Sequence, residues 1–230
     1  FGYARVLDGY DAATFTDGGF AFDKIGNYDS GVRNWWNCGV RTNTLFGGSS
    51  KVEFDLETVG QQTSFGVLRI YIKKGVNNDD PTNAVGFYNG LQLIYHGNSN
   101  RPGGANVETL QPVTNGDETY EEHTKEKNSD GTDRYENFDA AGLFGENAKL
   151  HVEIRMEPLA GENGETKFTY TFSEIGKENP DTYTFFSYAT QAASSAESEG
   201  EYNELFYVAF MTENVQCRIS NFAVSAYKVY

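Results

Sequence analysis

The sequence predicts an all-β fold, a two-sheet antiparallel β-sandwich, on three observations. Aromatic residues make up 15% of the 230 residues, with 15 Tyr and 17 Phe. They recur beside Val, Ile and Thr in short runs that 25 Gly and many Asn interrupt, a composition typical of strands and turns. Several of these runs alternate apolar and polar residues, and no long stretch has helical periodicity. We expect one domain covering residues 1–230.

The alternation of apolar and polar residues locates the individual strands. In KVEFDLE (51–57), Val52, Phe54 and Leu56 share one face, and charged residues occupy the other. KLHVEIRME (149–157) repeats this plan, and KFTYTF (167–172) follows it after the turn GENGE, which predicts a hairpin. Further strands are expected at VLRIYIK, GLQLIYH, TYTFF, ELFYVAFM and NFAVSAYKVY. With a tryptophan-containing segment, the total is nine or ten strands.

Two polar segments interrupt the strand pattern. Residues 114–137 are almost wholly polar and predict a long surface excursion, and the small residues of 189–200 predict a loop or a short helix. Neither is expected to be a domain linker, because apolar strands resume after each. The chain begins with Phe1 rather than Met, which suggests an excised domain or a processed chain, the module of a larger protein.

The charge of the chain restricts its partners. A formal net charge of −15 and a pI near 4.5 repel phosphate backbones and anionic lipids, so neither nucleic acid nor membrane surfaces are expected partners. Neutral ligands and divalent cations remain. The chain has no apolar run of about 18 residues that would insert in a membrane. Cys38 and Cys217 are either small buried hydrophobes or a single bridge.

Both tryptophans stand side by side in NYDSGVRNWWNCGV (27–40). If residues 32–41 are extended, Trp36 shares a mostly apolar face with Cys38 and Val40, which predicts a core position. Trp35 instead shares a face with polar residues. An indole among guanidinium and amide groups suits a sugar ring, because the indole stacks on the ring while the donors meet its hydroxyls. We therefore predict a sugar platform of Trp35 with Arg33, Asn37 and Arg41; the alternative is that Trp35 packs beneath a loop or stacks with an arginine.

A second aromatic and polar cluster occupies residues 87–101. Alternation places Leu91, Leu93 and Tyr95 opposite Gln92, Ile94 and His96, which predicts a half-buried strand that ends in a polar loop. Short amide side chains in such a loop can recognise hydroxyls, although an ordinary Gly/Asn turn has the same composition. Tyr88, Tyr95 and His96 are the candidate ligand contacts from this cluster.

Calcium is the only metal that the composition suggests. Hard cations need clustered oxygen ligands, and two stretches offer them: VNNDDPTN (76–83) and KNSDGTDRYENFD (127–139). The second is favoured, with Asn128, Asp130, Asp133 and Glu136 as its ligands. The segment lacks a suitable last glutamate for an EF-hand, and Asx-rich loops are common without metal. The three histidines show no metal-ligand spacing. A structural Ca²⁺ thus stays open, and no cofactor is expected to be required.

Two stretches carry a resemblance to known families. CRISNFAVSAYKVY resembles the closing strand of laminin-G-like and concanavalin A-like, legume-lectin-like jelly rolls, and HVEIRMEPLAGENGETKFTYTFS resembles their adjacent hairpin. The resemblance implies two curved antiparallel sheets with neighbouring terminal strands, which would let Cys38 and Cys217 approach. In composition, which is acidic and rich in Tyr and Asn, the chain also resembles surface glycan-capture modules of gut bacteria, including starch-adherence proteins.

Jelly-roll endoglucanases suggest the main enzymatic alternative, because one strand carries their catalytic acids at alternate positions. Here Glu153, Arg155 and Glu157 have that spacing, but an Arg replaces the central acid. Retaining hydrolysis needs one protonated carboxyl, and a neighbouring Arg favours ionisation of both glutamates. A solvated charge ladder explains the triplet better, so no catalytic residue is expected.

The sequence as a whole favours a non-catalytic, lectin-like carbohydrate-binding module, monomeric and outside the cell or at its surface. Its expected ligand is a neutral polysaccharide such as an α-glucan (starch), because anionic polymers do not suit the charge. The alternatives are a protein-binding adhesion or structural module and a jelly-roll glycoside hydrolase or lyase.

Overall fold

The computed structural model of the chain describes residues 1–6, 13–22, 38–44, 46–47, 49–59, 65–74, 87–96, 105–110, 138–140, 147–158, 166–180, 182–189, 205–213 and 215–226. These residues form fifteen strands in two antiparallel sheets, which confirms the predicted all-β sandwich. They contain no helix, and so none that is long and apolar enough to cross a membrane. The strand count exceeds the nine or ten predicted, because short strands of two to six residues were missed.

The larger sheet has eight strands and is named here the β14 sheet. Seven of its strands follow the order β1-β4-β14-β7-β8-β9-β10. The eighth strand, β5, pairs with β14 and stands outside this order. The bounds are β1 (Gly2–Val6), β4 (Cys38–Arg41), β5 (Phe46–Gly47), β7 (Phe65–Lys74), β8 (Phe87–His96), β9 (Ala105–Leu110), β10 (Phe138–Ala140) and β14 (Leu205–Glu213).

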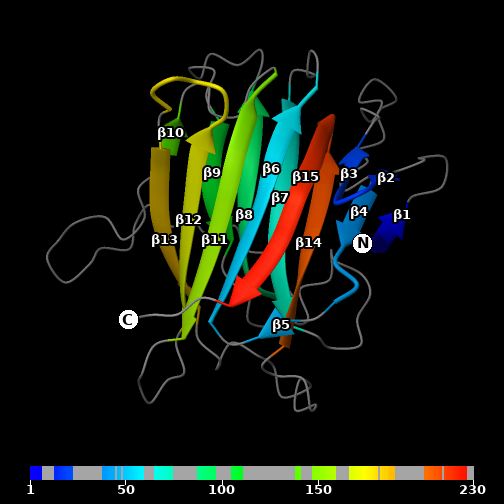
Figure 1. Cartoon of the computed structure of the whole chain (residues 1–230), viewed down its shortest axis with the longest axis vertical. Coiled ribbons are helices and arrows are strands. Elements are labelled where there is room, and N and C mark those ends of the chain that lie inside the picture. The colour runs from blue at the N-terminus through cyan, green and yellow to red at the C-terminus, as the bar shows by residue number, and fades with distance from the viewer. Residues whose placement is uncertain are drawn as a thin grey trace, which may run out of the picture.

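The second sheet, the β6 sheet, has seven strands in the order β13-β12-β11-β6-β15-β3-β2. Figure 1 shows it in front of the β14 sheet, with β6 and β11 near its centre. The bounds are β2 (Thr14–Thr16), β3 (Gly19–Phe22), β6 (Ser50–Thr58), β11 (Lys149–Pro158), β12 (Thr166–Glu174), β13 (Thr182–Ala189) and β15 (Cys217–Ala226). The predicted β11–β12 hairpin is present, since Leu150 to Pro158 pair with Glu174 to Thr166.

The core lies between the sheets and follows the alternation in the sequence. In β6 the burial pattern is strictly alternating, and Val52, Phe54 and Leu56 are fully buried as predicted. β11 repeats the pattern with Leu150, Val152, Ile154 and Met156. Each such side chain contributes about 1.5–3 kcal/mol by leaving water. β6 and β11 therefore each bury one face in the core and expose the other face to solvent, as the sequence predicts.

Aromatic rings join the two sheets across the core. Phe210 of β14 makes edge-to-face contacts with Phe54 of β6 and Phe20 of β3, each with ring centroids 5.2 Å apart. Phe222 of β15 and Phe1 extend the cluster. Edge-to-face pairs of this kind add about 0.5–1.5 kcal/mol beyond the burial of their area. The cluster fixes how β14 is placed relative to the β6 sheet.

The hairpin of β2 and β3 depends on two glycines. Asp17 and Gly18 form its two-residue turn, and Gly18 has a φ of 76°, which a residue without a Cβ adopts at little cost. Glycine is required at position 19 for a different reason: a Cβ there would lie 2.0 Å from the carbonyl oxygen of Ile219 in β15. β3 thus packs against β15 at a distance that only glycine permits.

The two cysteines lie in different sheets. Cys217 is buried at the start of β15 and is present as a thiol, whereas Cys38 begins β4 of the β14 sheet. β15 does lie beside the N-terminal strand β3, as the jelly-roll resemblance implies. The strand that carries Cys38, however, pairs with β1 and β14. The bridge left open by the sequence is therefore absent at Cys217.

Candidate functional site

The predicted tryptophan platform directly precedes β4 in the sequence. Trp35, Arg33 and Asn37 lie outside the described residues, so their role remains a prediction. β4 begins directly after them at Cys38 and ends at Arg41. Val40 is fully buried in the core, and Arg41, one residue on, is only partly buried. The alternation predicted for residues 32–41 thus holds at its described end, and it puts Arg41 on the face away from the core.

Arg41 lies on an aromatic ring of the neighbouring strand. Its guanidinium carbon is 5.3 Å from the centroid of the Tyr207 ring, within the range of a cation–π contact. Tyr207 belongs to β14 and is only 2% exposed. The contact restricts the orientations open to a long, flexible side chain.

The outer face of β14 is buried, although it points away from the other sheet. Phe206, Val208 and Phe210 belong to the core cluster, whereas the intervening Tyr207, Ala209 and Met211 do not. These three are nevertheless at most 2% exposed. The centre of this outer face is therefore closed to solvent. Polar interactions there operate in a lower effective dielectric than on an open sheet.

Strand pairing places a buried arginine in the middle of the same face. Met211 pairs with Gly39 of β4 and with Arg69 of β7, and Arg69 pairs in turn with Gln92 of β8. Arg69 is only 2% exposed. Charged groups are buried to this extent only when they are paired or hydrogen-bonded. Arg69 had no signal in the sequence, because it sits inside the apolar run VLRIYIK.

The second predicted cluster lies in β8, which is a strand over all of Phe87–His96. Tyr95 and His96 occupy the register positions opposite Gly66 and Phe65 of β7. Tyr88 lies at an irregularity, because the pairing shifts between Ile72 and Lys73. The structure thus puts β8 and Arg41 in one sheet, separated by β14 and β7.

The predicted calcium ligands Asn128, Asp130, Asp133 and Glu136 lie outside the described residues. Within the part of the chain that the structure describes, no group of three or more His, Cys, Asp or Glu side chains could hold a metal ion. Calcium binding remains an expectation from the sequence.

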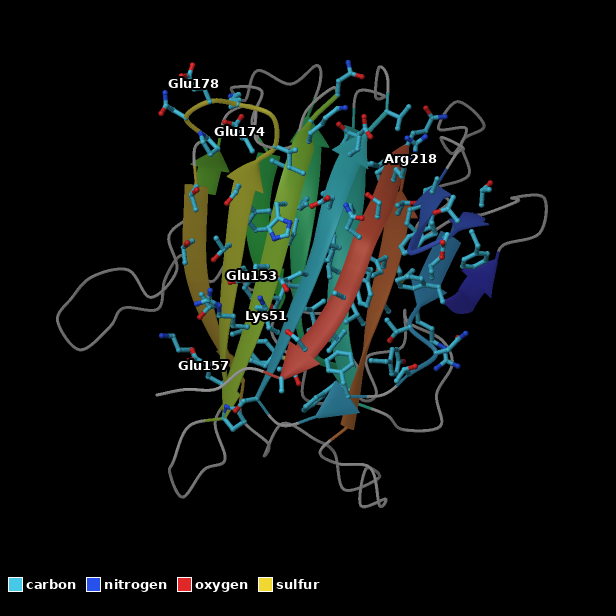
Figure 2. The ribbon with its side chains drawn as sticks, in the orientation of Figure 1. Lys51, Glu153, Glu157, Glu174, Glu178 and Arg218 are labelled. Atoms are coloured by element: carbon cyan, nitrogen blue, oxygen red, sulfur yellow. The ribbon has the colours of Figure 1, made fainter. Side chains whose placement is uncertain are left out.

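The glutamates of the hydrolase-like triplet lie on the outer face of the β6 sheet, and Glu153 belongs to a ladder of ion pairs there. Lys51 of β6 lies between two carboxylates, with its Nζ 2.8 Å from Glu53 Oε2 and 3.7 Å from Glu153 Oε2. The hydrogen bond to Glu53 raises the pKa of Lys51 above its ordinary value. Arg155 Nε lies 2.6 Å from the other oxygen of Glu153. Figure 2 shows Lys51 and Glu153 together in the middle of the sheet, with Glu157 nearer one end.

Beside this ladder, three strands meet at one carboxylate. Asp55 of β6 is bound through Oδ1 to His151 Nδ1 at 2.8 Å, and Asn221 Nδ2 of β15 donates to Oδ2 at 2.7 Å. Asn221 has a φ of 53° at the register shift of β15, which turns this residue toward Asp55. His151 Nε2 lies 3.9 Å from Glu53 Oε1. The network links the central strands and was missed by sequence reasoning, since its members are far apart in the chain.

No protein-family model and no curated protein matches the sequence. Among solved structures, the chain is similar to the marine PL-14 alginate lyase from Aplysia kurodai, with a TM-score of 0.50, 11% identity, and 91% of this chain and 83% of that chain covered. It is also similar to the CBM2 module of the evolved Dit of Lactobacillus casei BL23 phage J-1, with a TM-score of 0.50, 7% identity, and coverage of 94% and 79%.

A legume lectin-like domain from Entamoeba histolytica aligns with a TM-score of 0.47 at 8% identity, over 94% of this chain and 87% of that one. The two structures at 0.50 show a shared fold. The two-sheet β-sandwich therefore has the fold of these structures, in agreement with the jelly-roll resemblance of residues 151–173 and 217–230.

Proposed function

We propose that this protein binds a polysaccharide beside β4, at the part of the β14 sheet where Arg41 is partly exposed, and does not cleave it. The observation that carries the proposal is the guanidinium of Arg41 held over the buried ring of Tyr207, at the strand that continues from the tryptophan segment. An aromatic platform with fixed hydrogen-bond donors is the arrangement that a sugar ring requires. Two similar structures are an alginate lyase and a CBM2 module, which supports a saccharide ligand in general.

In this proposal Trp35 is the platform, and Arg33, Asn37 and Arg41 bind the hydroxyls around it. Tyr88, Tyr95 and His96 of β8 contribute a second set of contacts on the same sheet. The ligand is a neutral polysaccharide such as an α-glucan, because the net charge of −15 repels polyanions. The protein works outside the cell or at its surface.

The ion pairs around Glu153 favour binding without cleavage. A glycosidase acid must hold a proton near neutral pH, which requires an apolar or acidic neighbourhood. Glu153 instead faces Lys51 with one oxygen and Arg155 with the other. The triplet therefore suits an ion-pair ladder on a sheet surface.

A glycan array, run with calcium and again with a chelator, tests the proposal. Retention of neutral glucans is expected, and a chelator effect would add a calcium site. A blank array under both conditions contradicts glycan binding and favours a protein-binding adhesion module. Release of reducing ends from a bound polysaccharide contradicts the non-catalytic role, and Glu153→Gln then tests whether the triplet is responsible.

A further inference from the structure

β15 is paired on both sides over only part of its length. β6 pairs with it from its first residue to its last, apart from the register shift. On the other side β3 pairs only with the first three residues of β15, and the N–H of Phe222 donates to the carbonyl of Gly18 in the β2–β3 turn. Past that bond, no described residue pairs on this side with Ala223–Ala226, named here the open edge. Figure 1 shows the β2–β3 hairpin beside the start of β15, with the arrowhead end extending past it.

The backbone of the open edge directs hydrogen-bonding groups away from β6. Successive residues of an antiparallel strand turn their N–H and C=O groups to opposite sides of the strand. Phe222 donates toward the β2–β3 turn, so Val224 and Ala226, two and four residues on, face the same side. Each of them therefore presents an N–H and a C=O to the open side.

The pairing with β6 leads to the same assignment independently. The N–H of Val59, directly after β6, donates to the carbonyl of Gln216, so the odd-numbered residues of β6 face β15. Ala223 and Ser225 lie opposite two of these residues and so direct their backbone groups to β6. The two residues that alternate with them therefore face the open side.

The side chains of the open edge are exposed on both faces of the sheet. All four of its residues are exposed. Val224 pairs with Val52, which is fully buried, and directly paired residues share a face, so Val224 lies on the core side. It is nevertheless 37% exposed. Natural edge strands commonly carry Lys, Pro or another charge that opposes pairing, and residues 221–226, NFAVSA, contain none of these.

We propose that the open edge binds an extended polypeptide segment of another protein as an added strand, with apolar and basic residues alternating along the segment. A peptide backbone supplies donors and acceptors at the repeat of alternate strand residues, about 7 Å, which matches Val224 and Ala226. An apolar side chain of the segment on the core side covers the exposed part of Val224. The open edge belongs to the β6 sheet and the proposed glycan site to the β14 sheet, so the two bind independently.

Basic residues suit the outward-facing positions of the added segment. Of the four charged residues on the outer face of β6, three are acidic, and Glu53 among them is 27% exposed. The added strand would lie about 10 Å from β6, two strand spacings away. Ala223 and Ser225 stand between them, and their small side chains leave a Lys or Arg side chain room to extend toward Glu53. A second copy of this chain is disfavoured, because each copy carries a net charge of −15.

Residue-resolved amide hydrogen exchange, measured by NMR on the whole chain, tests the proposal. The probe is the blocked octapeptide KVKVKVKV at millimolar concentration, with the acidic EVEVEVEV and the non-alternating KKKKVVVV as matched peptides. KVKVKVKV should slow the exchange of the Val224 and Ala226 amides about tenfold, the value of one hydrogen bond, and leave those of Ala223 and Ser225, already bonded to β6, unchanged. The matched peptides should protect less.

Three results overturn the proposal. The first is unchanged exchange of Val224 and Ala226 in the presence of KVKVKVKV. The second is equal protection by either matched peptide, which removes the basic or the alternating character of the segment. The third is protection that rises with protein concentration in the absence of peptide, because the occupant is then a second copy of this chain.

Proline variants locate the binding at the open edge. Val224→Pro removes an N–H that does not bond to β6, and proline is tolerated where the N–H of an edge strand faces solvent. It should keep the fold and abolish the protection of Ala226 by KVKVKVKV, whereas the control Val224→Thr keeps the N–H and should keep the protection. Persistent protection in Val224→Pro, or equal loss in Val224→Thr, overturns the proposal. Ala226→Pro, read at the Val224 amide, replaces the first variant if melting curves show that it does not fold.

Discussion

Replacement of Gly19 by alanine tests how tightly the N-terminal hairpin is built into the β6 sheet. The added Cβ would lie 2.0 Å from the Ile219 carbonyl oxygen and 3.0 Å from Ser220 Cα. Both are backbone atoms, so β3 has to move away from β15 by roughly 1 Å to restore ordinary contacts. That movement disturbs three paired positions, Phe20–Ile219 to Phe22–Cys217, and the packing of two core phenylalanines.

The expected loss of unfolding free energy is about 3–4 kcal/mol, from about 1 kcal/mol for each weakened hydrogen bond and a comparable cost of overpacking. Urea unfolding monitored by circular dichroism measures this loss as a lower midpoint. Gly18→Ala is the matched control, because nothing lies within 4 Å of its Cβ and only its positive φ opposes alanine. It should cost only about 1 kcal/mol. Equal stability of the two variants would refute the close approach of β3 to β15.

Two further predictions concern the β6 sheet and the core. Asp55→Ala removes the hydrogen-bond acceptor of both His151 and Asn221. Because these groups are partly exposed, the free energy of unfolding measured in urea should fall by about 1–2 kcal/mol. An unchanged urea midpoint would show that the network does not stabilise the fold. Burial raises the pKa of Tyr170 above that of a tyrosine in the unfolded chain. The stability that the protonated Tyr170 contributes is therefore complete below the unfolded pKa of about 10. It is lost as the pH rises toward the folded pKa, by up to about 1.4 kcal/mol per pH unit. Above pH of about 10, the free energy of unfolding of Tyr170→Phe should therefore fall less steeply with pH than that of the parent protein. Parallel pH profiles of the two free energies would contradict this.

The strands that the sequence predicts best are those that bury one face and expose the other to solvent. β6 and β11 alternate because their outer sides carry charges to solvent, so a single sequence indicates the strands and which residues they bury. β14 is apolar on both faces, so ELFYVAFM predicts a strand but not that its outer side is closed around Tyr207. β2, β9 and β10 lack a distinctive apolar run and were missed.

The contacts of the candidate site depend on pairing between distant segments. Asp55 meets His151 and Asn221 across separations of 96 and 166 residues, which no local pattern encodes. Arg41 was predicted as a binding residue from its neighbours in the sequence, yet Tyr207 beneath it comes from the other end of the chain. Local alternation thus identified a face of β4, and only the sheet order revealed which residues complete it.

The central claim is that sugar rings bind at the side of β4 opposite the core. Affinity electrophoresis of Trp35→Ala and Trp36→Ala in amylose gels, beside melting curves, tests it most directly. Trp35→Ala should lose retardation and keep its melting temperature, whereas Trp36→Ala should lose about 3–5 kcal/mol of stability by opening a core cavity. A Trp35→Ala protein that is retarded as strongly as the parent protein would contradict the claim.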